Sequence, residues 1–284
     1  LEVTCLDEDF ARCAKADPEV SILEFLTLSP RNSDSIAKCI ALARENARMV
    51  RDQLSEEMWR ELNRLHLFLK SPAARDEWEF SPQDFYDRIV RVSLLFQGLV
   101  EATIAQKEGY LFVQVGKYLE RADKTTRILD IPTHYRGDLP VSPWPTVLRA
   151  TSARSAYIAS RGATICEEDA LSLLLFDHHF PRSVRFCLNQ VDNALHEISG
   201  TPRGRYRDEA ERLAGAALAN VDFNGPGDLA ELGLHAYADH LQDQLNGIGQ
   251  QIFETYVLLP SEVQDSPQLA AAIVTDYQQA AQQQ

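Results

Sequence analysis

Apolar residues recur every three or four positions from residue 33 to residue 69. They are Ile36, Ile40, Ala43, Ala47, Val50, Leu54, Met58, Leu62, Leu65 and Leu69. Because an α-helix turns by about 100° per residue, this spacing gathers them on one helical face. No segment alternates apolar and polar residues over the length of a strand. The sequence therefore predicts an all-α protein, a multi-helix bundle with long amphipathic helices.

Short local signals predict where these helices begin and end. Ser55 precedes two glutamates and is typical of a helix N-cap, so the stretch divides near Leu54. The segment "SPAARDEWEFSP" (residues 71–82) carries turn chemistry, and a new helix is expected from Pro82. Helical periodicity then continues to Asp130, with a break expected around Glu108-Gly109.

The stretch "DIPTHYRGDLPVSPWP" (residues 130–145) holds four prolines and is predicted to be a linker or long crossover. We interpret residues 1–284 as a single domain, with residues 131–145 as the place for any sub-boundary and residues 276–284 as a frayed tail. The helices expected after the linker are Pro145–Arg161, Glu167–Phe176, Pro181–Ile198, Tyr206–Asn220 and Leu229–Leu259.

The net charge of the chain limits the classes of partner that it is expected to bind. With 42 acidic and 28 basic residues, the net charge is −14, which argues against general affinity for nucleic acid or an anionic membrane. Five scattered cysteines without a C-x-x-C pair favour reduced thiols, and no apolar run approaches the ~18 residues of a membrane span. A cytoplasmic location is therefore expected, without a zinc or disulfide framework.

Glu120 and Arg121 are adjacent within the helix expected to end at Asp130. Their side chains point about 100° apart, so they cannot both face one neighbour. One interpretation is a solvated face on which Glu120 pairs with Lys124. The other is a helix contacted on several sides, where Glu120 and Arg121 reach different neighbours and fix the register or line a polar cavity.

Two further segments could bind an anion. Arg44, Arg48 and Arg51 follow one ridge of a helix, although intrahelical pairs such as Arg48–Asp52 are the favoured explanation. In "DHHFPRSVRFCL" (residues 177–188), Pro181 would begin a helix with Arg182 and Arg185 just inside, or the segment is an ordinary polar loop.

No motif for catalysis or for a cofactor is present. The sequence has no P-loop, no Rossmann glycine fingerprint, no nucleophile elbow and no H-E-x-x-H, so no catalytic residue and no cofactor are predicted. Glu231, His235, Asp239 and Asp243 share one edge of the last long helix, which invites a metal interpretation. Because no Glu-x-x-His repeat faces them, a solvated flank is favoured and no metal is predicted.

Three stretches carry a resemblance to a known family: "SIAKCIALARENARMVRDQLSEEMWRELNRL", "LFQGLVEATIAQKEGYLFVQVGKYLERADKTTRILD" and "FPRSVRFCL". Together they resemble the bacterial Alpha-E domain, an all-helical family with a Glu-Arg motif, from about Ile22 to about Val263. The motif then corresponds to Glu120-Arg121, and the family's A-R-E-N-A-R segment to Ala43–Arg48. The family's usual first helix is not present before Leu1, which suggests an N-terminal truncation, and Asn32-Ser33 replaces its usual Asn-Pro.

The resemblance implies an association with ATP-grasp proteins similar to peptide or amide ligases. Our leading hypothesis is a non-catalytic accessory protein that binds such a ligase or its peptide-like substrate. The residues expected to bind are Glu45, Arg48, Arg51, Glu120, Arg121 and Arg182. The alternatives are an enzyme acting on amide or phosphate groups, with Glu120 as base and Arg121 stabilising an anion, or a purely structural protein. The oligomeric state is not predicted.

Overall fold

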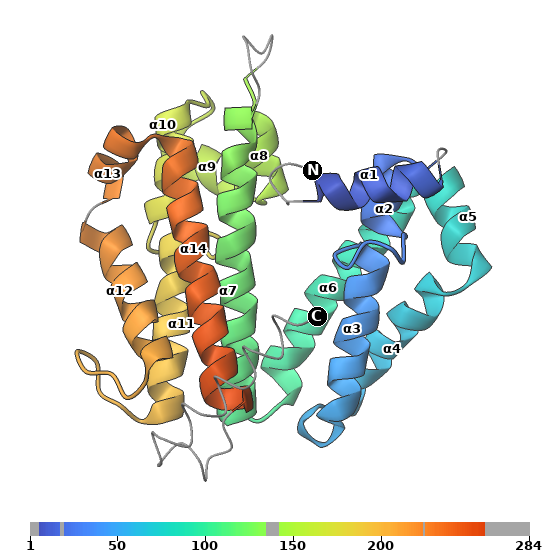
Figure 1. Cartoon of the computed structure of the whole chain (residues 1–284), viewed down its shortest axis with the longest axis horizontal. Helices are drawn as coiled ribbons and strands as arrows, with labels where there is room; N and C mark the ends of the chain where they lie inside the picture. The colour runs from blue at the N-terminus through green and yellow to red at the C-terminus, as the bar shows by residue number, and fades with distance from the viewer. Residues whose placement is uncertain (1–5, 18–19, 135–141, 224, 259–284) are drawn as a thin grey trace. The chain divides into compact units, whose positions relative to one another are not determined.

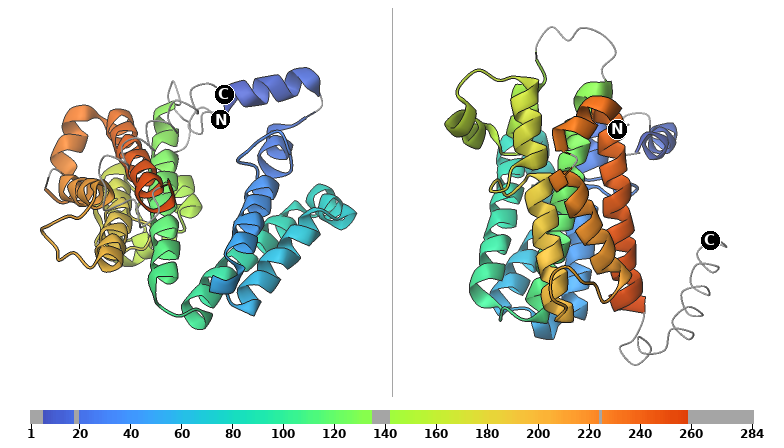
Figure 2. Two further views of the ribbon diagram at one scale, coloured as in Figure 1. Left: turned by 60° about the horizontal axis from the view of Figure 1, so that its bottom comes forward. Right: turned by 90° about the vertical axis from the view of Figure 1, so that its left-hand side faces the viewer.

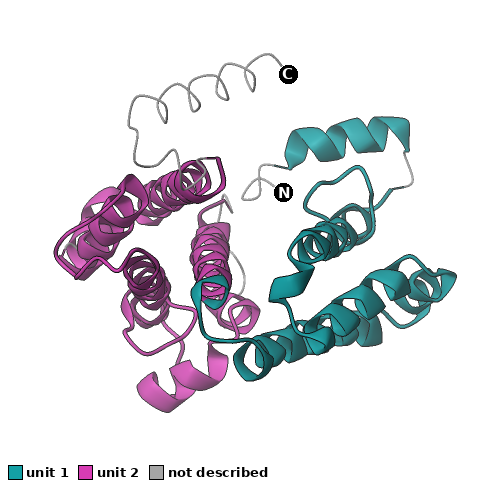
Figure 3. Cartoon of the chain, turned by 90° about the horizontal axis from the view of Figure 1, so that it is seen from below, with its two compact units in different colours: residues 1–110 teal, residues 111–284 magenta. Residues whose placement is uncertain are grey.

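The computed structural model describes residues 6–17, 20–134, 142–223 and 225–258 (Figure 1). Within these ranges every regular element is helical, which confirms the all-α prediction. The chain falls into two compact units, residues 1–110 and residues 111–284, shown in separate colours in Figure 3. The Pro-rich stretch predicted to be a linker lies inside the second unit. Its residues 135–141 and the expected tail at 276–284 lie outside the described ranges.

The elements of the first unit are α1 (Asp7–Ala16), α2 (Ile22–Thr27), α3 (Ile36–Met49), the 3₁₀ turn η2 (Arg51–Gln53), α4 (Glu56–Leu69), α5 (Pro72–Phe80) and α6 (Pro82–Thr103). The unit is built on the helices α3, α4 and α6, with α4 antiparallel to the other two. The Arg44 side chain reaches Asn63, which joins α3 to α4, and the Phe68 and Phe85 rings pack together, which joins α4 to α6. Phe85 is fully buried.

Local capping explains most boundaries of the first unit. The expected division near Leu54 is confirmed, since the Ser55 hydroxyl accepts a hydrogen bond from the backbone N–H of Met58 over 3.2 Å. The helix expected from Pro82 is also present. The expected turn at residues 71–82 is wrong, because Pro72 occupies the first position of α5 and preorganises its backbone. The later break falls at residues 104–107, just before the expected position.

The core of the second unit is a bundle of four long helices: α7 (Glu108–Asp130), α11 (Val184–Ser199), α12 (Glu209–Phe223) and α14 (Leu234–Phe253). Figures 1 and 2 show these helices side by side. The remaining elements are η3 (Ile131–His134), α8 (Trp144–Ala150), α9 (Arg154–Arg161), α10 (Glu167–Leu171), the π-helical η4 (Ser172–Phe176), α13 (Gly225–Leu232) and the π-helical η5 (Glu254–Leu258).

Contacts at both ends establish that α7 runs antiparallel to two neighbours. The Tyr118 ring lies 5.8 Å from that of Phe186 at the start of α11. The Phe112 ring lies 5.2 Å from that of Tyr256 after the end of α14. Helix α14 approaches α7 closely, because a Cβ atom at Gly249 would lie 3.4 Å from Leu119 Cδ2. Fully buried side chains such as Leu129, Leu188, Leu195 and Ile248 fill the bundle.

Several boundaries of the second unit differ from expectation, and α12 begins and ends three residues later than expected. The helix expected at 145–161 is two helices, because the chain turns at Ser152, whose φ is 55°. The helix expected at 229–259 is divided at Gly233, where a φ of 80° favours glycine. Pro181 does not begin a helix; Ser183 is the N-cap of α11 and accepts a hydrogen bond from the N–H of Phe186 over 3.0 Å.

Ser183 is buried and also donates a hydrogen bond to the Asp177 carbonyl oxygen. We therefore expect Ser183→Ala to lower the free energy of unfolding by about 1–2 kcal/mol, since an N-cap serine is lost and two partly buried backbone groups lose a partner. Urea denaturation followed by far-UV circular dichroism measures this change. Ser155→Ala, at an exposed site on α9, is the matched control and should change it by less than about 0.5 kcal/mol. Equal losses in both variants would contradict the capping role.

Candidate functional site

Glu120 lies on the solvent-facing side of α7. Its side chain is 73% exposed, and its carboxylate lies 3.6 Å from the Lys124 ammonium group one turn later. The Glu120–Lys124 pair considered from the sequence is therefore present. A pair this exposed contributes little to stability, which leaves the Glu120 carboxylate accessible to solvent and to partners.

Arg121 turns away from Glu120 toward the start of α11. Its guanidinium group lies 5.3 Å from the centre of the Tyr118 ring, and the Lys117 ammonium group lies 4.5 Å from the same ring. The Tyr118 ring in turn packs edge-on against Phe186. Cation–π contacts of this kind hold long basic side chains in place, so both cations are kept on the face of α7 that meets α11.

Arg182 joins these two basic residues from the segment before α11. The Thr125 hydroxyl donates a hydrogen bond to the Arg182 carbonyl oxygen over 3.0 Å, which fixes this segment against α7. Partial burial lowers the pKa of Arg182, and the positive charge of Arg121 lowers it further. Lys117, Arg121 and Arg182 thus form a cationic cluster, and a carboxylate or phosphate group would match its charge.

The cationic cluster lies against the buried thiol of Cys187. Burial raises the pKa of Cys187 to about 12, although the charges of Arg121, Arg182 and Lys117 act in the opposite direction. The thiol is therefore neutral at physiological pH. A neutral, buried cysteine is a poor nucleophile, so this group contributes packing beneath the cluster and no reactive thiolate.

The other predicted binding residues lie in the first unit. The Glu45 carboxylate accepts a hydrogen bond from Arg48 over 2.9 Å and another from Arg44. These two hydrogen bonds lower the pKa of Glu45, and the bond from Arg48 has the larger effect. The intrahelical pairing considered from the sequence is therefore present, but Arg48 pairs with Glu45 and not with Asp52, because α3 ends at Met49 and Asp52 lies in the next turn. Arg51 donates to the Leu54 carbonyl oxygen over 3.1 Å and stacks on Trp59, so it stabilises the α3–α4 connection.

Sequence reasoning missed a polar cluster between α11 and α12. His196 lies between two acids, with Nε2 3.5 Å from the Asp192 carboxylate and Nδ1 3.7 Å from that of Glu211. The pKa of Asp192 is raised above its ordinary value, mainly by burial. The charges of His196 and Arg203 oppose this shift, and the charge of Glu211 adds to it. These three side chains line a cavity of about 400 Å³. Asp192 and His196 are four residues apart on one helix, and this spacing is the local sequence signal that could have identified the pair.

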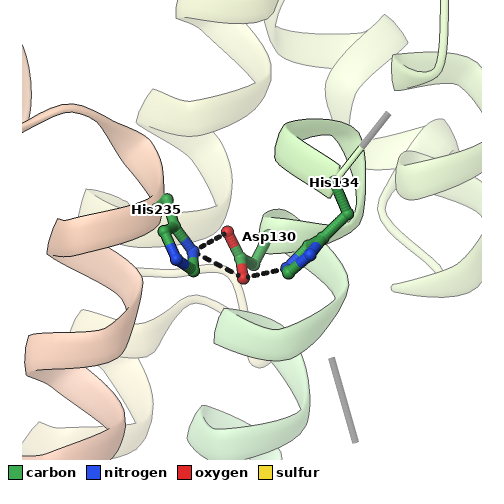
Figure 4. A group of neighbouring side chains, drawn as sticks. All are labelled: Asp130, His134 and His235. Atoms are coloured by element: carbon green, nitrogen blue, oxygen red, sulfur yellow. Dashed lines mark hydrogen bonds and ion pairs between the residues drawn. The ribbon is translucent and has the colours of Figure 1, made fainter. Parts of the chain in front are cut away.

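A third polar group joins the C-terminal end of α7 to the first turn of α14 (Figure 4). His235 Nδ1 lies 3.0 Å from each oxygen of the Asp130 carboxylate, and His134 Nε2 lies 2.8 Å from Oδ2. Burial raises the pKa of Asp130, but hydrogen bonds from Thr133, His134 and His235 outweigh it, so the pKa lies below its ordinary value. Asp130 is therefore an anion at neutral pH, and the three ligand-type side chains could hold a metal.

The predicted solvated edge of the last helix is thus only partly correct for His235. Its side chain is half exposed, yet one ring nitrogen reaches Asp130, which is 105 positions away in the sequence. His178 and His179 form no comparable group: the Asp177 carboxylate accepts the backbone N–H groups of His179 and Phe180, each over 2.7 Å, and closes a local turn.

Comparison with known families finds a match over most of the chain. The model of the Alpha-E family, described as "a predicted alpha-helical domain with a conserved ER motif", matches residues 1–257. No curated protein and no solved structure matches the chain. Among the described residues, no helix combines the length and the apolar character that crossing a membrane requires.

The position of Cys187 predicts selective labelling of the thiols. With a pKa of about 12, about one Cys187 thiol in ten thousand is ionised at pH 8, and burial blocks access as well. Iodoacetamide should therefore label the exposed Cys39 and Cys166 in the native protein and leave Cys187 unmodified until denaturant is added. Peptide mass spectrometry measures the three sites together. Labelling of Cys187 at the rate of Cys39 would contradict a buried thiol beneath the cationic cluster.

Proposed function

The chain belongs to the Alpha-E family, and we propose that it is a non-catalytic helical binding protein that works with an ATP-grasp-type peptide or amide ligase. Its contact with that system is the cationic cluster of Lys117, Arg121 and Arg182. The group bound there is a carboxylate presented by the ligase or by its peptide-like substrate.

The observation that carries the proposal is the approach of Arg121 to Arg182. Arg121 comes from α7 and Arg182 from the turn before α11, and the pKa of Arg182 is lowered first by burial and then by the charge of Arg121. Two cationic groups brought together in a partly buried site favour the negative charge of a bound anion. A carboxylate supplies this charge and accepts paired N–H groups from a guanidinium.

The surroundings of the cluster favour binding over reaction. The chain carries a net charge of −14, so a concentrated group of cations differs in sign from most of the surface and can select an anionic partner. Guanidinium and ammonium groups remain protonated at neutral pH and therefore cannot act as bases. The Cys187 thiol beside the cluster is held in its neutral form.

An enzyme acting on amide or phosphate groups is the second candidate, and the cavity at His196 favours it. A histidine held between two carboxylates is an arrangement suited to general acid–base catalysis. Glu211 is fully buried, and its Oε1 atom has no hydrogen-bond partner among the described residues. Glu120, exposed on α7, is less suited to the role of base.

We expect a co-expressed ATP-grasp ligase from the same genome to be retained by the immobilised wild-type chain and lost from the double variant Arg121→Ala, Arg182→Ala. The loss should be at least about tenfold, because each charged contact contributes on the order of 1.5–3 kcal/mol. Arg149→Ala is the matched control, since this exposed arginine on α8 lies outside the cluster and should leave retention unchanged. Circular dichroism verifies that each variant is folded. Retention by the double variant would remove the cluster from the interface, and no retention by wild type would exclude the accessory role.

The enzymatic candidate predicts turnover that depends on His196. If the cavity is catalytic, the purified chain should hydrolyse p-nitrophenyl phosphate or a peptide p-nitroanilide above the buffer rate, and His196→Gln should lower that rate by about 10²–10⁴. His240→Gln, at an exposed position on α14, should leave it unchanged. Absence of turnover by wild type, or turnover that His196→Gln does not alter, would exclude this candidate for these substrate classes.

A further inference from the structure

We propose that Asp130, His134 and His235 form a binding site for one divalent transition-metal ion of the Zn²⁺ class. This inference goes beyond the ligase-binding function and uses none of the residues of the cationic cluster. Two imidazole nitrogens and a carboxylate oxygen are a donor set that zinc and related first-row ions prefer.

The three donor atoms are already close enough to share an ion. All of them lie within 4.8 Å of one another, and the two nitrogen-to-oxygen separations at Asp130 are 2.8 and 3.0 Å. Donors at about 2.0–2.1 Å from a tetrahedral zinc ion lie about 3.3 Å apart. Small rotations of the two imidazole rings therefore suffice, without movement of either helix.

A second layer of groups holds the donors in the orientation that a metal requires. The Thr133 hydroxyl donates a hydrogen bond to Asp130 Oδ1 over 2.6 Å, which leaves Oδ2 directed toward His134. Behind His235, the Asp239 carboxylate lies 3.5 Å from Nε2. A metal at Nδ1 needs the ring proton on Nε2, where Asp239 can accept it, and this carboxylate–histidine–metal order is common in zinc sites.

The site has a buried anionic donor on one side and a solvent-exposed histidine on the other, as expected for an accessible metal site. The Asp130 side chain is only 4% exposed, whereas that of His235 is 56% exposed. The metal would thus rest on a fixed anion at the base of the site and keep its remaining positions toward solvent. Asp130 and Asp239 together give the site a negative charge before metal binding, which favours a dication.

The same distances also fit a simpler arrangement in which both histidines donate N–H groups to Asp130. That arrangement needs no role for Asp239, and it predicts no dependence of stability or spectra on metal. The two arrangements can therefore be separated by a substitution that leaves Asp130 and its hydrogen bonds intact.

The test is calorimetric titration of the dialysed full chain with ZnCl₂. Wild type should bind one equivalent, and His134→Gln or His235→Gln should weaken binding by more than tenfold. Asp239→Asn, which alters only the outer layer, should weaken it by about tenfold. His240→Gln, an exposed histidine on the same helix as His235, is the matched control and should bind like wild type.

Substitution with Co²⁺ identifies the donors. The visible spectrum of the Co²⁺ form should show d–d bands without a thiolate charge-transfer band, which excludes the exposed Cys39 and Cys166 as ligands. The proposal is overturned if wild type binds no stoichiometric Zn²⁺, if His134→Gln and His235→Gln bind it as tightly as wild type, or if a thiolate band appears. Should either histidine variant lose helicity by circular dichroism, the exposed Asp239→Asn decides, and unchanged affinity in that variant overturns the proposal.

Discussion

The packing of α7 against two antiparallel partners determines where the polar groups of the second unit lie. Arg121 and Asp130 are nine positions apart, which is about 900° of helical rotation, or two and a half turns. They therefore project from opposite sides of α7. One side meets the start of α11 and places Arg121 beside Arg182, and the other meets the start of α14 and places Asp130 beside His235. A single rigid helix thus separates a cationic group from an anionic one.

Periodicity was sufficient to predict the fold class, because an amphipathic helix must bury its apolar face whichever neighbour covers it. It was not sufficient where backbone geometry overrides side-chain pattern. The apolar pattern continues through residues 229–259, yet Gly233 divides it, since the chain there adopts a φ that interrupts the helix. At 71–82 the error was opposite: Pro72 was taken as part of a turn, although proline is also favoured in the first position of a helix.

The sites depended on tertiary contacts that a single sequence does not contain. Arg121 and Arg182 were each named from local motifs, but only the antiparallel packing of α7 and α11 brings them together. Asp130 was placed at the end of a predicted helix and His134 in the linker, although their i, i+4 spacing continues the last turn of α7 and is the same spacing that marked His235 and Asp239. Reading that spacing at both helix ends would have found the two halves of the group, and the contact between them spans 105 positions.

The adjacency of Glu120 and Arg121 has a direct geometric consequence. Since neighbouring helical residues point about 100° apart, a helix that fixes Arg121 against α11 must direct Glu120 away from it, toward solvent. The motif therefore combines an inward cation, held by Tyr118 and set beside Arg182, with an outward anion only weakly paired to Lys124. A partner that presents both a carboxylate and a basic group could engage the two residues at once. If Glu120 and Arg121 exchanged places, the anion would face α11 and the cation would face solvent. For the proposed binding role, the order of the two residues would therefore matter as well as their identity.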